Sequence, residues 1–232
     1  MPSLNCPPLP SDGRSKLRAT TRQRILDAAE ELVLEEGPAG LRTKDLVARS
    51  GVSERTIFNH FESIEATALA RIEDYLIPLF CDLEIPADAP VGQLPAIVRQ
   101  QLLANLSDAA GQEQLAGFIR LAAALASSSG EVLTRHVLIT LTGMGRAAAD
   151  RAEAQHPELS MDDRLALRLF TNNLAIATAF GLARGALTLL PGDEAEEPGG
   201  VEEMLSHLPD VATFVPHITW AYDQVSAGAP QL

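Results

Sequence analysis

Apolar residues recur at every third or fourth position along most of the chain beyond residue 19, which is the spacing of helices that bury one face. Alternation of apolar and polar residues, which is typical of half-buried strands, is absent. Residues 1–19 differ from the rest because they are rich in Pro, Ser and Gly. The pattern therefore predicts an all-α protein preceded by a disordered tail over residues 1–19.

Residues 20–62 are expected to form three short helices. Thr20 and Gln23 match a capping box that begins the first helix, and Gly37 and Pro38 end it. The other two helices, at 43–50 and about 53–61, lie on either side of a tight turn, which predicts a helix-turn-helix unit.

The turn of this unit is centred on Gly51, because only glycine adopts the left-handed conformation there without strain. Thr43 and Ser53 have side chains suited to the N-caps of the helices before and after the turn. The apolar residues expected to face inward are Leu46, Val52, Ile57 and Phe61.

A connecting helix over residues 63–83 is expected next, and Pro78 should kink it or end it early. Residues 84–232 then form a helical body that opens with the Pro-rich stretch 84–92. The helices expected in the body are 93–107, 112–127, 131–156 and 162–190, with Gly130 separating the second from the third. A last helical region at 201–225 should be divided by Pro209 and Pro216.

The net charge of −13 argues at first against a nucleic-acid partner, but the charges are unevenly distributed. Residues 14–60 hold nine basic and seven acidic side chains, so this segment carries +2 and the remainder carries −15. Such asymmetry favours a protein with one part close to an anionic partner, although an acidic protein with no such partner can show it as well.

Neither Cys6 nor Cys81 indicates a disulfide framework or a metal site, and no secretory signal is seen. The uncharged run between Arg168 and Arg184 is short and contains polar residues, so no membrane span is expected. We therefore expect a cytoplasmic protein.

The outward face of the segment 53–61 has the chemistry that base recognition requires. An arginine can bind guanine O6 and N7, an asparagine can pair with adenine N6 and N7, and a helix N-terminus favours a phosphate. Glu54 is explained equally well as a first-turn acid, and the basic tail as disordered chain or as an arm for the minor groove. The predicted DNA contacts are Arg42, Thr43, Lys44, Ser53, Glu54, Arg55, Thr56, Phe58, Asn59 and His60.

Residues 20–72 resemble the N-terminal domain of the TetR family of bacterial transcriptional regulators. The likeness rests on TRQRILDAAEELVLEEG at 21–37 and SGVSERTIFNHFES at 50–63, with Leu41 and Thr43 between them. It implies a three-helix DNA-binding head, a linking fourth helix and an all-helical body that binds a ligand and dimerises.

Three positions depart from the family pattern. Val47 stands where a small Ala is usual, which predicts a slightly wider crossing of the two short helices. Phe58 replaces a Tyr and Ile64 replaces a Lys, so that two groups able to bind phosphate are missing. Arg42, Lys44 and the basic tail are expected to compensate.

Polar and aromatic residues on the otherwise apolar helices of the body are the candidate lining of an effector pocket. Each of them alone is more often structural, since a Thr commonly bonds to its own helical turn. No group of residues has the spacing of metal ligands or of a catalytic nucleophile, so neither a cofactor nor an enzymatic reaction is predicted. The candidates are Phe118, Arg120, His136, Thr140, Thr142, Met144, Asn172, Asn173 and Phe180.

Residues 162–190 are apolar on two faces, and a single chain covers both only if this helix is fully central. Together with 201–225 this segment is predicted to form an isologous four-helix dimer interface. Small residues, among them Gly181 and Gly185, would let the partner helix approach closely. The expected interface residues are Leu169, Ile176, Ala179, Ala183 and Leu187.

The sequence therefore predicts a homodimeric DNA-binding regulator, by family habit a repressor, that a small molecule releases from a palindromic duplex operator. An activator is the alternative within this class, because the position of the operator relative to the promoter decides the sign. A ligand-binding protein or enzyme with a vestigial head is the alternative from another class. The retained Arg55 and Asn59 and the caps at Thr43 and Ser53 argue against it.

Overall fold

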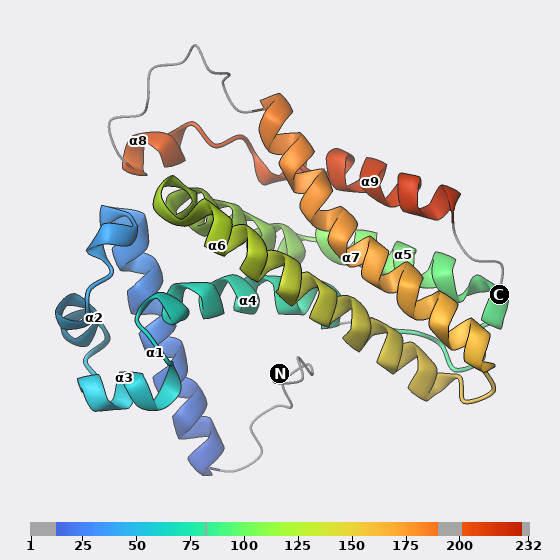
Figure 1. Cartoon of the computed structure of the whole chain (residues 1–232), viewed down its shortest axis with the longest axis horizontal. Coiled ribbons are helices and arrows are strands. Elements are labelled where there is room, and N and C mark those ends of the chain that lie inside the picture. The colour runs from blue at the N-terminus through green and yellow to red at the C-terminus, as the bar shows by residue number, and fades with distance from the viewer. Residues whose placement is uncertain (1–12, 82, 190–200, 229–232) are drawn as a thin grey trace.

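The computed structural model describes residues 13–81, 83–189 and 201–228, and all regular structure in this part of the chain is helical (Figure 1). The fold is therefore all-α, as the sequence predicts. The elements in order are α1 (Gly13–Glu36), η1 (Pro38–Gly40), α2 (Thr43–Ser50), α3 (Glu54–His60), α4 (Glu65–Cys81), η2 (Val91–Gln93), α5 (Leu94–Ser107), α6 (Ala109–Gln155), α7 (Met161–Leu189), α8 (Val201–Ser206), η3 (Val211–Thr213) and α9 (Val215–Ala227).

Helix α1 begins at Gly13, so the prediction of a disordered tail is wrong for residues 13–19, while residues 1–12 lie outside the described residues. The predicted capping box is also wrong, because Thr20 lies inside the helix and its hydroxyl donates to the Lys16 carbonyl oxygen at 3.0 Å. Residues 14–19 include Lys, Leu, Arg and Ala, which are good helix formers, and contain no Pro or Gly. A helix that is anchored further along the chain therefore extends about two turns toward the N-terminus.

Helices α1, α2 and α3 form a head with a small apolar core of its own (Figure 1). Leu46 and Ile57, two of the residues predicted to face inward, are fully buried, and Phe61 is nearly so. Val52 is half-buried and packs against this core. The other buried members are Ile25, Leu26, Ala28, Ala29 and Leu32 of α1, with Ile64.

Helix α4 connects the head to the body and is tied to α1 by a partly buried polar cluster. Arg71 Nε donates to Glu30 Oε2 at 2.7 Å, and the Tyr75 hydroxyl donates to the other oxygen of the same carboxylate. The Arg71 guanidinium also lies 4.7 Å from the centre of the Tyr75 ring. Burial and the Glu30 carboxylate raise the pKa of Tyr75 to about 12, so its hydroxyl stays a donor at neutral pH.

Helix α6 has a continuous helical backbone of 47 residues, where the sequence predicts two helices that meet at Gly130. It is nevertheless far from straight. Gly117 lies against Tyr75, and His136 Nε2 lies 3.2 Å from Glu73 Oε1. A straight helix would separate positions 117 and 136 by about 28 Å, whereas 73 and 75 are two residues apart on α4. Helix α6 therefore bends sharply where two separate helices are expected. The parts before and after the bend, which we call its arms, contact different sides of α4, the first at Tyr75 and the second at Glu73.

Helix α7 packs between α6 and α9 (Figure 1). A Cβ added at Gly181 would lie 2.5 Å from Ile218 Cα, and one at Gly185 would lie 2.6 Å from the Phe214 ring. The prediction that these glycines admit a partner's helix is therefore wrong, because α9 of the same chain occupies the space beside them.

Among the described helices, α7 is long and apolar enough over Met161–Leu187 to cross a membrane by length and composition. The core helix of a soluble protein meets the same criterion. Phe170 and Leu174 are buried in the body, and Arg168 Nε donates to Glu153 Oε1 of α6 at 2.6 Å. Helix α7 therefore has the contacts of a core helix.

Replacing Gly117 by Ala should destabilise the protein by about 1–3 kcal/mol, because the added methyl group would lie 2.2 Å from the Tyr75 ring. Gly130→Ala is the matched control in the same helix, since a Cβ there meets no atom within 4 Å. The control should be neutral or stabilising by up to about 1 kcal/mol. Urea unfolding followed by circular dichroism measures both, and equal stabilities would contradict the close packing at Gly117.

Candidate nucleic-acid interface

The turn between α2 and α3 has the conformation that the sequence predicts. Gly51 ends α2 in the left-handed region with φ of 65°, and Ser53 caps α3 by accepting the Thr56 backbone N–H at 3.2 Å. Arg24 of α1 donates to the Ser50 carbonyl oxygen at 2.7 Å. The turn, and with it the start of α3, is thereby fixed to α1.

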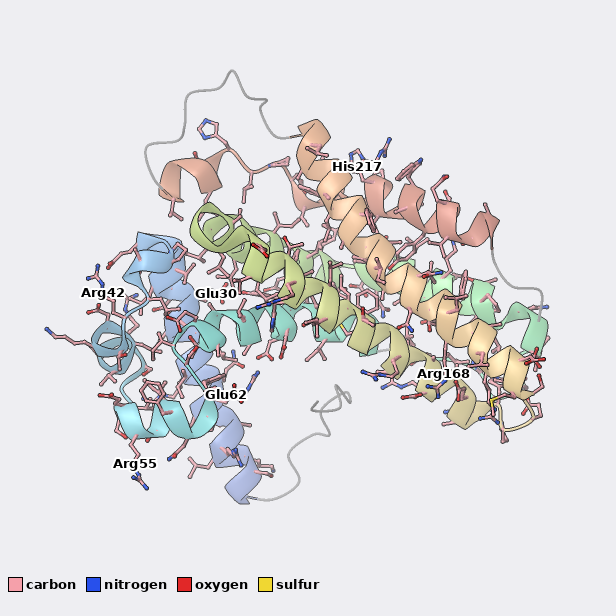
Figure 2. All side chains as sticks on the ribbon, in the orientation of Figure 1. Glu30, Arg42, Arg55, Glu62, Arg168 and His217 are labelled. Atoms are coloured by element: carbon pink, nitrogen blue, oxygen red, sulfur yellow. The ribbon has the colours of Figure 1, made fainter. Side chains whose placement is uncertain are left out.

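The prediction that Thr43 caps α2 is wrong. Arg42 occupies the N-cap position and its side chain makes no capping hydrogen bond, while Thr43 is the first residue of the helix. Asp45 in the first turn instead places a negative charge near the helix N-terminus, where it is favourable. Arg42 and Lys44 are exposed at this end of α2, and Figure 2 shows Arg42 pointing away from the body.

Helix α3 turns one face into the head and the other to solvent. Ile57 is fully buried, whereas Arg55 and Asn59, four residues apart, are exposed on the outward face. Phe58 is 46% exposed beside them. Figure 2 shows the Arg55 side chain extending away from the head. This face can therefore present a bidentate donor and an amide to base edges in a major groove.

The other side chains predicted to contact DNA from α3 and its N-cap differ in exposure and in the hydrogen bonds they already make. The hydroxyls of Ser53 and Thr56 lie 2.8 Å apart and are used in the cap. Glu54 is exposed in the first turn, where a carboxylate also stabilises the helix dipole. Burial, together with the positive charges of Arg18 and Arg22, lowers the pKa of His60, so this half-buried imidazole is neutral at pH 7.

Several basic residues of the head stabilise the fold and add little to the free positive charge. Arg22 Nη1 lies 2.6 Å from Asp74 Oδ2, and Arg49 binds Glu31 and Glu35. Within the described residues, the exposed cations of the head that form no ion pair are Lys16, Arg18, Arg24, Arg42, Lys44 and Arg55, and of these Arg24 is held by the Ser50 carbonyl oxygen. Lys16 and Arg18 belong to the basic tail that is expected to compensate for the missing phosphate contacts, and the structure places them on a helix in place of a disordered chain.

Two residues that depart from the family pattern, Ile64 and Val47, pack in or against the core of the head. Ile64 is 7% exposed and belongs to that core, so this position contributes packing in place of a phosphate contact. Val47 is half-buried and packs against the same core.

The predicted effector-pocket residues do not gather around one cavity. Arg120, Asn173 and Phe180 are exposed in the single chain, so their place in an effector pocket stays a prediction. Thr142 is also exposed and donates to the Leu138 carbonyl oxygen, the structural role that is usual for a helical Thr.

The remaining pocket candidates are inside the body but apart from a common cavity. Phe118, Thr140 and Met144 are buried, Asn172 is half-buried, and His136 lies beside Glu73 of α4. A cavity of about 330 Å³ lies elsewhere, at the C-terminal end of α4, and none of the predicted residues lines it. Its lining residues are Leu83, Glu84, Gln101, Asn105 and Arg151.

One comparison with known proteins bears on the head. Residues 25–70 match the family model of bacterial regulatory proteins of the tetR family, and the match covers part of α1, all of α2 and α3, and the start of α4. No curated protein matches the chain. Among solved structures it is similar to a protein from Mesorhizobium loti MAFF303099 assigned to the TetR-family transcriptional regulators, with 18% identity, coverage of 91% of this chain and 97% of that chain, and a TM-score of 0.45.

Replacing Arg55 by Ala should weaken binding to the preferred duplex by about 1–3 kcal/mol and relax the base preference at one position of each half-site. Lys44→Ala removes the same charge from another exposed position and should weaken binding to all sequences alike. Selection from a randomised duplex library, followed by gel-shift titration, measures both effects. An Arg55→Ala variant that keeps the wild-type preference would remove Arg55 from base recognition.

Replacing Phe58 by Tyr should tighten binding by about 0.5–1.5 kcal/mol on every duplex, since the exposed ring would gain a hydroxyl able to donate to a phosphate. Phe58→Leu is the control that removes the ring without adding a donor. The same titrations measure both variants. Weaker binding by Phe58→Tyr would mean that the bare ring packs against DNA where a hydroxyl loses its hydration.

Proposed function

We propose that this chain, a DNA-binding transcriptional regulator of the TetR family, acts as a repressor that binds a palindromic operator as a homodimer and leaves it when a small molecule binds the body. The observation that carries the proposal is the geometry of α3. This helix is capped, the chain just before it is fixed to α1 at Ser50, and it keeps Arg55 and Asn59 exposed on one face. Its place of action is then the bacterial cytoplasm.

The apolar stripe on α7 supports the homodimer. Leu169, Phe180 and Leu187 are 64%, 65% and 86% exposed, and their spacing places them on one side of the helix. Large exposed apolar side chains aligned on one face of a helix are typical of an interaction surface. A second copy of the chain, related by a twofold axis, would cover the stripe and place two recognition helices about 34–36 Å apart, one turn of DNA.

Helix α4 is the proposed route from effector to DNA. It contacts α1 through the Glu30 cluster and lies between the two arms of α6, so its tilt sets the position of the head relative to the body. An effector shifts this equilibrium only by the difference between its affinities for the two states. Gln101 and Asn105, which line the cavity at the C-terminal end of α4, favour a small polar effector.

The experiment that tests the proposal selects genomic fragments with the purified protein and then measures transcription from the recovered promoters with and without it. Enriched fragments with a palindromic core and reduced transcription are expected. Increased transcription would overturn the repressor assignment in favour of an activator. The absence of any enriched fragment would overturn DNA recognition itself.

Replacing Phe180 by Glu should give a folded monomer that binds the operator about 100-fold or more weakly, because two linked recognition helices bind with avidity. The side chain is exposed in the single chain, so the substitution leaves the core of the body intact. Ala96→Glu adds the same charge at an exposed position of α5 and should change neither property. Sedimentation velocity and operator titration measure both variants, and a dimeric Phe180→Glu protein would refute this interface.

A further inference from the structure

The first two turns of α1, residues 13–20, form a helical extension that we term the basic arm. Its sequence has three basic residues, Arg14, Lys16 and Arg18, and no acidic one. The side chains of residues 16–20 are all exposed, and Leu17 is 69% exposed. The arm therefore carries a concentrated positive charge on a chain whose net charge is −13.

The arm continues past the C-terminal end of α3. Arg22 Cζ lies 5.8 Å from the centre of the Phe61 ring, directly after α3, and Arg18 is one helical turn earlier on the same face of α1. The charge of Arg18 is close enough to His60 to lower the pKa of that imidazole. Figures 1 and 2 show the start of α1 projecting beyond α3 on the side toward which Arg55 extends.

Arg18 carries a free positive charge near the C-terminal end of α3, where the other basic side chains supply none. Arg22 is neutralised by Asp74, and the pKa of His60 is lowered, so neither adds free positive charge at pH 7. Phe58 has no hydroxyl to offer to a phosphate. Arg18 is exposed and forms no ion pair with another described residue.

We infer that the basic arm holds Arg18 against a phosphate of the duplex, next to the end of the recognition helix. The inference rests on the DNA binding proposed above and adds a contact outside the helix-turn-helix unit. Because the arm is helical, Arg18 is presented from one fixed face. Lys16 lies about 200° around the helix from Arg18 and points to the other side of the arm.

The test measures the affinity for a mixed-sequence duplex and for the selected operator between about 50 and 200 mM salt. Arg18→Gln should make the slope of log affinity against log salt shallower by about one per bound subunit, with the same fold loss on both duplexes. Lys16→Gln removes the same charge from the other face of the arm and should leave the slope closer to that of the wild type. Ala19→Pro keeps both charges but interrupts the helix, and should give the slope of Arg18→Gln.

Each other result has a defined meaning. A wild-type slope for Arg18→Gln would overturn the contact while leaving the regulator proposal intact. Equal effects of Arg18→Gln and Lys16→Gln would overturn a fixed contact in favour of diffuse attraction, as would a wild-type slope for Ala19→Pro. If the wild-type protein binds neither duplex at low salt, the proposed function itself fails. Circular dichroism of each variant confirms that the head remains folded.

Discussion

The Glu30 carboxylate is the group on which the arrangement of head and body depends. It is 9% exposed, and a charge so far from water needs partners of its own. Arg71 and Tyr75 supply them from α4, and the Tyr75 ring rests in turn against the backbone of α6 at Gly117. Helices α1 and α6 therefore both contact α4 at the Tyr75 side chain. Removal of either partner would leave the carboxylate buried without full compensation, which costs more than the pair itself contributes.

Local signals in the sequence predicted the helix-turn-helix unit well. Gly51 and Ser53 act through their own backbone and the next few residues, so their roles could be inferred without knowledge of the rest of the fold. Thr43 is not the cap that its residue type predicts, because Ser, Thr, Asp and Asn mark helix starts only on average; Arg42 is at the N-cap and Thr43 is the first residue of α2. The sequence does not predict the start of α1, because its first turns show no apolar pattern and depend on the packing of the later turns.

In the candidate site too, some residues can be predicted from local sequence and others only from the tertiary fold. The outward positions of Arg55 and Asn59 follow from helical periodicity, and the structure places both in solvent. The cavity beside α4 is lined by Gln101 and Arg151, fifty residues apart, and no pattern along the chain connects such residues. The small size of Gly181 predicts that another helix packs closely against it, but the tertiary fold decides that this helix is α9 of the same chain and not one from a partner.

The bend in α6 restricts the movement of α4, because both arms of α6 contact that helix. Helix α4 is gripped at Tyr75 by one arm and at Glu73 by the other, and these two positions face different sides of α4. A large change in the tilt of α4 would therefore have to separate the two arms of α6. The stretch between the arms contains three consecutive serines and Gly130, and a Cβ at Gly130 would meet no neighbour. Because the bend of α6 lies between Gly117 and His136, a displacement of α4 requires the two arms to move relative to each other.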